Sequence, residues 1–163
     1  MRPIVVMGIS GSGKSTVGAA LARRLEIPYA DADDFHSRAN VAKMSAGHPL
    51  TDADRDPWLR AIADWLAEHA GTGCVVSCSA LRRRYRDLLR TGTPGVVFVH
   101  LDGDPDVAQR RVAGRPSHFM PADLVASQVA TLEPLGADEH GIVVDFDTPL
   151  DALVASLADR VRA

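Results

Sequence analysis

Long apolar runs are missing from this sequence, and with them any sign of a membrane segment. No uninterrupted apolar stretch approaches the ~20 residues that a membrane-spanning helix needs. The first apolar run begins at Ile4, which leaves no room for a signal peptide before it. We therefore expect a protein of the cytoplasm that has no contact with a membrane.

Cysteine is scarce, and its placement excludes a disulfide framework. The two cysteines, Cys74 and Cys78, lie on one predicted strand. At ~3.3 Å per residue they would be about 13 Å apart, which is too far for a disulfide bond. No histidine lies at metal-site spacing from either of them. We expect both thiols to be free and buried in the core.

An excess of positive charge is also lacking. The 18 Lys plus Arg and 21 Asp plus Glu give a formal net charge of −3 at pH 7. Because a basic surface is the usual signature of nucleic-acid binding, we expect no nucleic-acid partner. The 163 residues, of which 46% are hydrophobic, are enough for one domain with a full core, covering residues 1–163.

One glycine-rich stretch carries the strongest functional signal. The apolar run Ile4–Met7 leads into the pattern G-x-x-x-x-G-K-S, and helical spacing of apolar residues follows it. This is the phosphate-binding loop, whose glycines let backbone N–H groups surround a phosphate chain at the positive end of a helix. We expect it to bind ATP through Gly8, Ile9, Ser10, Gly11, Ser12, Gly13, Lys14, Ser15 and Thr16.

Lysine is rare, which makes its presence in this loop informative. Only Lys14 and Lys43 are lysines, because the chain otherwise uses arginine. A compact ammonium suits a site crowded with phosphate oxygens. We predict that Lys14 is catalytic and reaches the β- and γ-phosphates, and that the Ser15 hydroxyl ligates Mg²⁺.

Strands and helices are predicted to alternate along the chain, which favours a parallel sheet with helices on both faces. The expected fold class is α/β, a P-loop nucleoside triphosphate hydrolase fold of the nucleoside-monophosphate-kinase type. It would have five strands and a helical lid at about residues 114–134. Proline favours the first turn of a helix, so one helix is expected to begin at Asp56-Pro57, after a loop. The predicted strands are 4–7, 27–30, 74–78, 95–101 and 142–146.

An acidic turn follows the second predicted strand, with carboxylates at Asp31, Asp33 and Asp34. Ligands of open α/β sheets bind at the carboxyl ends of the strands, so this turn should lie beside the phosphate loop. Residues i and i+2 of an extended chain point the same way. We expect Asp31 to face the water shell of Mg²⁺ and Asp33 to accept the proton of an acceptor hydroxyl.

A phosphate loop occurs in ATPases, GTPases and small-molecule kinases, and two absences separate these classes. The single asparagine, Asn40, is not followed by lysine, so there is no guanine-reading Asn-Lys-x-Asp turn. The third strand ends in Ser77-Cys78-Ser79, without the acidic residue with which motor ATPases hold Mg²⁺. A small kinase fits best, and Arg111 and Arg115 are predicted to stabilise its transferring phosphoryl group from a mobile lid.

Further stretches make the chain resemble the bacterial gluconokinases of the shikimate-kinase-like group. They are GISGSGKS, DADDFHSRANVAKMSAGHPLTDADRDPWL, CSALRRRYRDLLR and RPSHFMPADLVASQVATLEPL, which together extend over nearly the whole chain. The second is the most diagnostic, with H-x-x-x-N-x-x-K-M before D-x-D-R-x-P-W-L. The resemblance implies ATP- and Mg²⁺-dependent phosphorylation of D-gluconate on its 6-hydroxyl, usually by a homodimer.

Gluconate is a small polyol with one carboxylate, so its pocket needs one or two cations and several hydrogen-bonding groups. We expect the substrate to be bound by Asp33, His36, Arg38, Lys43, Arg55, Arg82 and His118. Shikimate kinase, or another small-molecule P-loop kinase, is an alternative, although the glycines usual after its third strand are replaced here by Cys78-Ser79-Ala80-Leu81. A regulatory protein that binds ATP without turnover is a third possibility.

Overall fold

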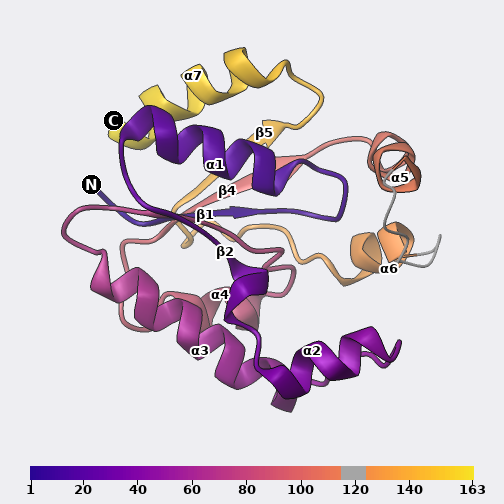
Figure 1. Ribbon diagram of the computed structural model, residues 1–163. Helices are drawn as coiled ribbons and strands as arrows, with labels where there is room; N and C mark the ends of the chain where they lie inside the picture. The colour runs from indigo at the N-terminus through magenta and orange to yellow at the C-terminus, as the bar shows by residue number, and fades with distance from the viewer. Residues whose placement is uncertain (115–123) are drawn as a thin grey trace.

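The strands of the protein form one parallel sheet between two layers of helices (Figure 1). The computed structural model describes residues 1–114 and 124–163. The strand order is β2-β3-β1-β4-β5, and every neighbouring pair is parallel. The strands are β1 (Ile4–Met7), β2 (Tyr29–Asp31), β3 (Val75–Ser77), β4 (Val97–Asp102) and β5 (Gly141–Asp145). The five-stranded parallel sheet of the expected fold class is confirmed.

Two pairs of helices cover the two faces of the sheet. Helices α1 (Lys14–Leu25) and α7 (Leu150–Arg162) pack together on one face, and α3 (Asp52–Glu68) and α4 (Arg83–Leu89) on the other (Figure 1). Three further described helices lie toward the carboxyl ends of the strands, where the loops that follow the strands also meet (Figure 1). They are α2 (Arg38–Ser45), α5 (Pro105–Ala113) and α6 (Leu124–Thr131).

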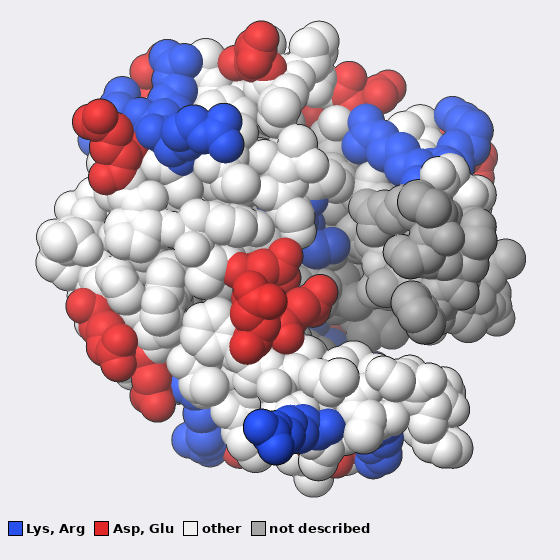
Figure 2. All heavy atoms as spheres, viewed as in Figure 1, with Lys and Arg blue, Asp and Glu red and all other residues white. Residues whose placement is uncertain are grey.

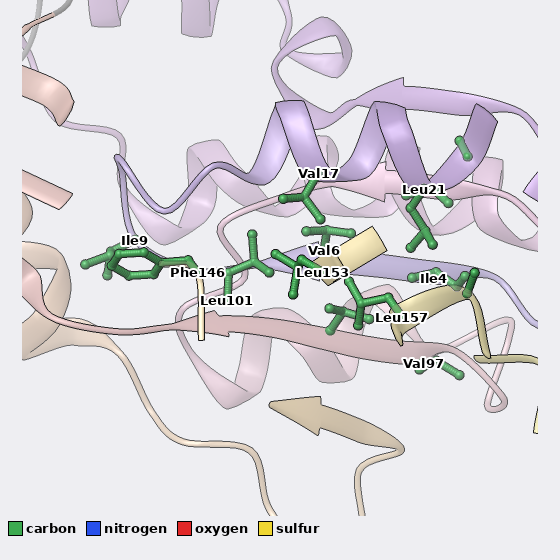
Figure 3. Packing of buried hydrophobic residues seen from close by; sticks show 14 of the residues in the cluster. Ile4, Val6, Ile9, Val17, Leu21, Val97, Leu101, Phe146, Leu153 and Leu157 are labelled. Carbon is green, nitrogen blue, oxygen red and sulfur yellow. The ribbon is translucent and has the colours of Figure 1, made fainter. Parts of the chain in front are cut away.

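The position of β1 at the centre of the sheet explains why its sequence is an unbroken apolar run. All four of its side chains are buried, because helices cover both of its faces. Ile4 and Val6 join the core beneath α1 and α7, where Figure 3 shows them close to Leu21 and Leu157. The alternate residues, Val5 and Met7, join the core beneath α3 and α4. The phosphate loop therefore starts at the end of a central strand that is fully buried.

Helix α3 corrects one prediction, since it begins at Asp52 and not at Asp56. Thr51 Oγ1 accepts a hydrogen bond from the Asp54 N–H (3.1 Å), and Asp54 Oδ2 accepts one from the Thr51 N–H (2.8 Å). This capping box starts the helix, and Pro57 lies inside it. Pro57 therefore does not mark the first turn, and the T-x-x-D pattern from Thr51 to Asp54 is the signal for the start of the helix.

The two cysteines agree with the sequence prediction. Both are free and buried, and burial raises the pKa of each thiol to about 12. Neither is therefore a nucleophile at neutral pH. Within residues 1–114 and 124–163, no helix is both long enough and apolar enough to cross a bilayer.

A fully buried ion pair joins Arg86 of α4 to Glu139, which precedes β5. Arg86 Nε donates to Glu139 Oε2 (2.7 Å), and its other nitrogens donate to the carbonyl oxygens of Ala80 (2.9 Å) and Pro134 (3.3 Å). Glu139 Oε1 also accepts from the Gly136 N–H (3.0 Å). One guanidinium thus holds together the loop after β3, helix α4 and the segment between α6 and β5.

Replacing Glu139 tests how much this pair contributes to stability. Glu139→Gln keeps the side-chain volume but leaves a buried guanidinium without its anion, so we expect the free energy of unfolding to fall by about 3 kcal/mol. Urea unfolding followed by circular dichroism measures it. The matched control is Asp138→Asn, which removes an exposed partner of Arg83 and should have a much smaller effect. An equal loss of unfolding free energy in the two variants would contradict the stabilising role of the buried ion pair.

Candidate active site

The phosphate loop, residues 8–16, connects β1 to α1 and is shaped by its glycines. Gly11 (φ 84°) and Gly13 (φ 94°) adopt left-handed backbone conformations that favour glycine. A Cβ atom on Gly11 would also lie 2.3 Å from the carbonyl oxygen of Ala108, so the loop packs directly against α5. Gly13 has no side chain to cap α1, which leaves the N-terminal end of that helix suited to an anion.

Hydrogen bonds from two neighbouring strands, β2 and β3, hold the backbone of Lys14 at the start of α1. The Tyr29 hydroxyl donates to Ser77 Oγ (3.0 Å), and Ser77 Oγ donates to the Lys14 carbonyl oxygen (2.8 Å). A Cβ atom on Gly18 would lie 2.3 Å from Ser77 Oγ, so only glycine lets α1 approach this closely. Lys14 Nζ itself donates to the Ile9 carbonyl oxygen (3.0 Å), which holds the ammonium across the loop.

Ser15 and Asp31, the two residues for which a magnesium site is predicted, lie side by side at the start of α1. Ser15 Oγ donates to Asp31 Oδ2 at 2.9 Å. A hydroxyl of the phosphate loop beside one carboxylate is a hard oxygen donor set, which fits Mg²⁺ that keeps several waters and binds nucleotide phosphates.

Asp33 lies in the same cavity as Asp31, but by a different geometry from the one expected. Strand β2 ends at Asp31, and a 3₁₀ helix (η1, Ala32–Phe35) follows, capped by Asp31 Oδ1 accepting from the Asp33 N–H (3.0 Å). The prediction that the two carboxylates point alike along an extended chain is therefore wrong. Both nevertheless line a cavity of about 220 Å³ together with Lys14 and Ser15, which we call the phosphate cavity.

The electrostatics of this turn favour proton acceptance by Asp33. Burial and then the charge of Asp31 raise the pKa of the Asp33 carboxyl, while His36 and Lys14 offset part of the effect. Burial also lowers the pKa of His36, against the opposing influence of Asp33. A carboxylate with a raised pKa is a stronger base than an ordinary aspartate, so Asp33 is the better suited of the two to accept a proton.

A larger cavity of about 630 Å³ adjoins the first, and we call it the acceptor cavity. In Figure 2 a patch of acidic side chains lies over the chain between β2 and α2, beside a hollow that opens above α2. His36 stacks on Trp58 (ring centroids 4.2 Å apart), and Trp58 Nε1 donates to the Ala32 carbonyl oxygen (2.7 Å). These contacts fix the acidic turn against α3. Both cavities are lined by Asp33, Trp58, Cys78, Ser79 and Gln128.

Two arginines from different elements line the acceptor cavity, Arg55 on α3 and Arg82 before α4. Tyr85 lies between these elements, where its hydroxyl donates to Asp52 Oδ1 (2.8 Å). The Arg55 guanidinium lies 5.7 Å from the centroid of the Tyr85 ring and 3.5 Å from Asp52. The result is a polar wall with two cations, which suits an anionic, hydroxyl-rich molecule.

Not every predicted substrate residue reaches this cavity. Asp33, His36, Arg55 and Arg82 are brought together around it. Among the residues that the structure describes, Lys43 and Arg38 line neither cavity. Lys43 Nζ donates to Asp54 Oδ2 (2.6 Å), which pins α2 to the capping box of α3 and lowers the pKa of Asp54 to about 2. Arg38 is exposed on α2.

Two further predicted residues, Arg115 and His118, lie in the segment 115–123, outside the described part of the chain. The predicted lid at about 114–134 is therefore seen only in part, as α6 and the residues that follow it. The roles assigned to these residues stay predictions.

Arg111 lies beside the phosphate loop but faces a third cavity, of about 450 Å³. Its Nη1 donates to the Gly11 carbonyl oxygen (3.3 Å), and its Nη2 donates to the Phe146 carbonyl oxygen (3.4 Å). The turn Asp147–Pro149 completes the wall of this cavity. Sequence reasoning missed this turn, although its place at the carboxyl end of the fifth strand was an available signal.

Comparisons with known proteins agree with this arrangement. Residues 10–135 match the family model described as shikimate kinase. The chain is 47% identical to the gluconokinase of Gluconobacter oxydans strain 621H, covering 99% of this chain and 92% of that protein. It is 42% identical to the thermoresistant gluconokinase of Escherichia coli K12, covering 97% and 92%.

A solved structure extends the likeness to three dimensions. The crystal structure of a gluconokinase from Sinorhizobium meliloti 1021 is 44% identical, with a TM-score of 0.84 over 99% of this chain and 95% of that one. Sequence, fold and the two adjoining cavities thus agree, and the chain belongs to the shikimate kinase family, in the branch that contains the gluconokinases.

Proposed function

We propose that this protein is a gluconokinase, which transfers the γ-phosphate of ATP to the 6-hydroxyl of D-gluconate and releases 6-phospho-D-gluconate and ADP. The observation that carries the proposal is the junction of the two cavities, where Asp33 lies between the phosphate loop and a pocket lined by Arg55 and Arg82. The names of the two gluconokinases and of the solved structure point to the same substrate.

The nucleotide is assigned to the phosphate loop and the third cavity. The loop at residues 8–16 surrounds the phosphates, and Lys14 neutralises charge on the β- and γ-oxygens. The base fits the third cavity, where the Arg111 guanidinium can stack on a planar ring beside Pro149. Ser15, and Asp31 through water, would hold Mg²⁺, which would supply charge neutralisation to the phosphates.

Gluconate is assigned to the acceptor cavity. Its carboxylate and its 6-hydroxyl stand at opposite ends of a six-carbon chain, so different groups must bind them. Arg55 and Arg82 suit the carboxylate, and Asp33 suits the hydroxyl. Because phosphoryl transfer passes through a loose transition state, Asp33 mainly orients the hydroxyl and accepts its proton late in the reaction.

The main alternative is shikimate kinase, for which the family model is named. An ADP-release assay with gluconate, with shikimate and with neither acceptor distinguishes the two enzymes from each other and from a protein that binds ATP without turnover.

We also propose that the chain is one domain with a lid at about 114–134, that it forms a homodimer and that it is located in the cytoplasm. Size-exclusion chromatography tests the dimer.

Lys14→Ala should abolish most of the activity while leaving the fold intact. The change removes a preorganised charge aimed at the transferring phosphoryl group, so we expect kcat to fall by about 10²-fold or more. Steady-state kinetics with gluconate measure it. Near-normal turnover would remove the phosphate loop from the mechanism.

Asp33→Asn should lower kcat by about 10²- to 10⁴-fold, the range for a lost general base. ATP affinity should change little, because the phosphate loop is untouched. Because the pKa of Asp33 is raised, the carboxylate is protonated at a higher pH than an ordinary aspartate. As the pH is lowered, the wild-type kcat/KM should therefore begin to fall at that higher pH, and this acid limb should disappear in the variant. A variant that loses Mg-ATP affinity as much as turnover would make Asp33 a metal ligand, with His36 the next candidate base.

Arg55→Gln should raise the KM for gluconate more strongly than it lowers kcat, because it removes a cation assigned to the carboxylate. Losing a charged hydrogen-bond partner costs about 1.5–3 kcal/mol, or roughly 10- to 100-fold in kcat/KM. The matched control is Arg60→Gln on the same helix, where Arg60 pairs with Asp56 at the surface. An unchanged KM for gluconate in Arg55→Gln would place the carboxylate elsewhere.

A further inference from the structure

Gln128 of α6 makes a direct contact with the phosphate loop. Its Oε1 accepts a hydrogen bond of 2.6 Å from the backbone N–H of Ser10, which lies 118 residues earlier in the chain. Among the described residues of α6, Gln128 alone lines both the phosphate cavity and the acceptor cavity. The half-buried amide thus lies where a phosphate donor and an acceptor would meet.

The contact with Ser10 determines which end of the Gln128 amide is bound by the loop and which end can bind a ligand. A glutamine side chain carries one acceptor oxygen and one NH₂ donor group. Because a backbone N–H can be bound only by the oxygen, Oε1 is held by the loop, and Nε2 is the end that can donate to a ligand. No role for Gln128 was predicted from the sequence, although the residue lies within the stretch RPSHFMPADLVASQVATLEPL.

The boundary between the two cavities needs a donor. Besides Trp58 and Cys78, the side chains that line both cavities are Asp33, Ser79 and Gln128. A γ-phosphoryl group placed there would bring its negative oxygens close to the Asp33 carboxylate. A neutral NH₂ donor that is already fixed in place stabilises such oxygens without reorganisation.

We propose that Gln128 is a further catalytic residue, whose Nε2 donates a hydrogen bond to an oxygen of the γ-phosphoryl group during transfer while Oε1 stays on the Ser10 N–H. This inference rests on the proposed kinase function and adds a donor to it. The opposing interpretation is that Gln128 is only a tether between α6 and the phosphate loop.

Two substitutions separate these interpretations. Gln128→Glu keeps the shape and keeps an oxygen for the Ser10 N–H, so it preserves the tether, but it replaces the NH₂ donor by a second anionic oxygen. Gln128→Leu removes both the tether and the donor. The matched control is Gln109→Leu, because Gln109 lies on the neighbouring helix α5 and is not among the described residues that line the two cavities.

The experiment measures kcat and the KM values for gluconate and ATP, together with Tm. We expect Gln128→Glu and Gln128→Leu each to lower kcat by about 10²-fold, with the Glu variant at least as impaired as the Leu variant. The KM for ATP should change much less, and Gln109→Leu should resemble the wild type.

A Gln128→Glu enzyme with wild-type kcat would overturn the proposal and leave Gln128 as a tether. A KM for ATP that rises as much as kcat falls would overturn it too, by assigning Gln128 to nucleotide binding. If Gln128→Leu fails to fold, the Glu variant alone decides. If the wild-type enzyme does not phosphorylate gluconate, the proposed substrate is contradicted instead. The variants are then compared with an acceptor for which the wild-type enzyme does release ADP.

Discussion

The acceptor cavity depends on the buried ion pair between Arg86 and Glu139. A buried guanidinium is tolerated only when its donors are satisfied, and Arg86 bonds to Glu139 and to carbonyl oxygens on both sides of it. This arrangement places α4, with Tyr85, next to the segment that follows α6. It also holds the carbonyl of Ala80, a residue with a left-handed backbone (φ 46°).

The remaining parts of the site come together because all strands are parallel. Their carboxyl ends share one edge, so the phosphate loop after β1, the acidic turn after β2 and the loop after β3 meet there. The turn after β5 reaches the same edge beside the phosphate loop. The phosphate loop brings backbone N–H groups and Lys14, the acidic turn brings carboxylates, and the loop after β3 brings hydroxyls. The turn after β5 forms a wall of the third cavity.

The charge of the site is set by the residues close to it and not by the net charge of the chain. The chain has a formal net charge of −3, yet Lys14 and Arg55 flank a turn with three carboxylates. The raised pKa of Asp33 and the lowered pKa of His36 both follow first from burial. The stacking of His36 on Trp58 therefore acts on the chemistry by fixing this turn against α3.

The phosphate loop, the five strands and the acidic turn could be predicted from the sequence, because each depends on a local pattern of glycine, apolar or acidic residues. It also indicated the family, since the diagnostic stretches are contiguous. Tertiary structure alone decided that Lys43 pins α2 to α3, that Arg111 faces a third cavity and that Gln128 binds Ser10. These side chains have partners 11, 100 and 118 residues away, and such pairings follow from how the elements pack at the sheet edge, which no local pattern encodes.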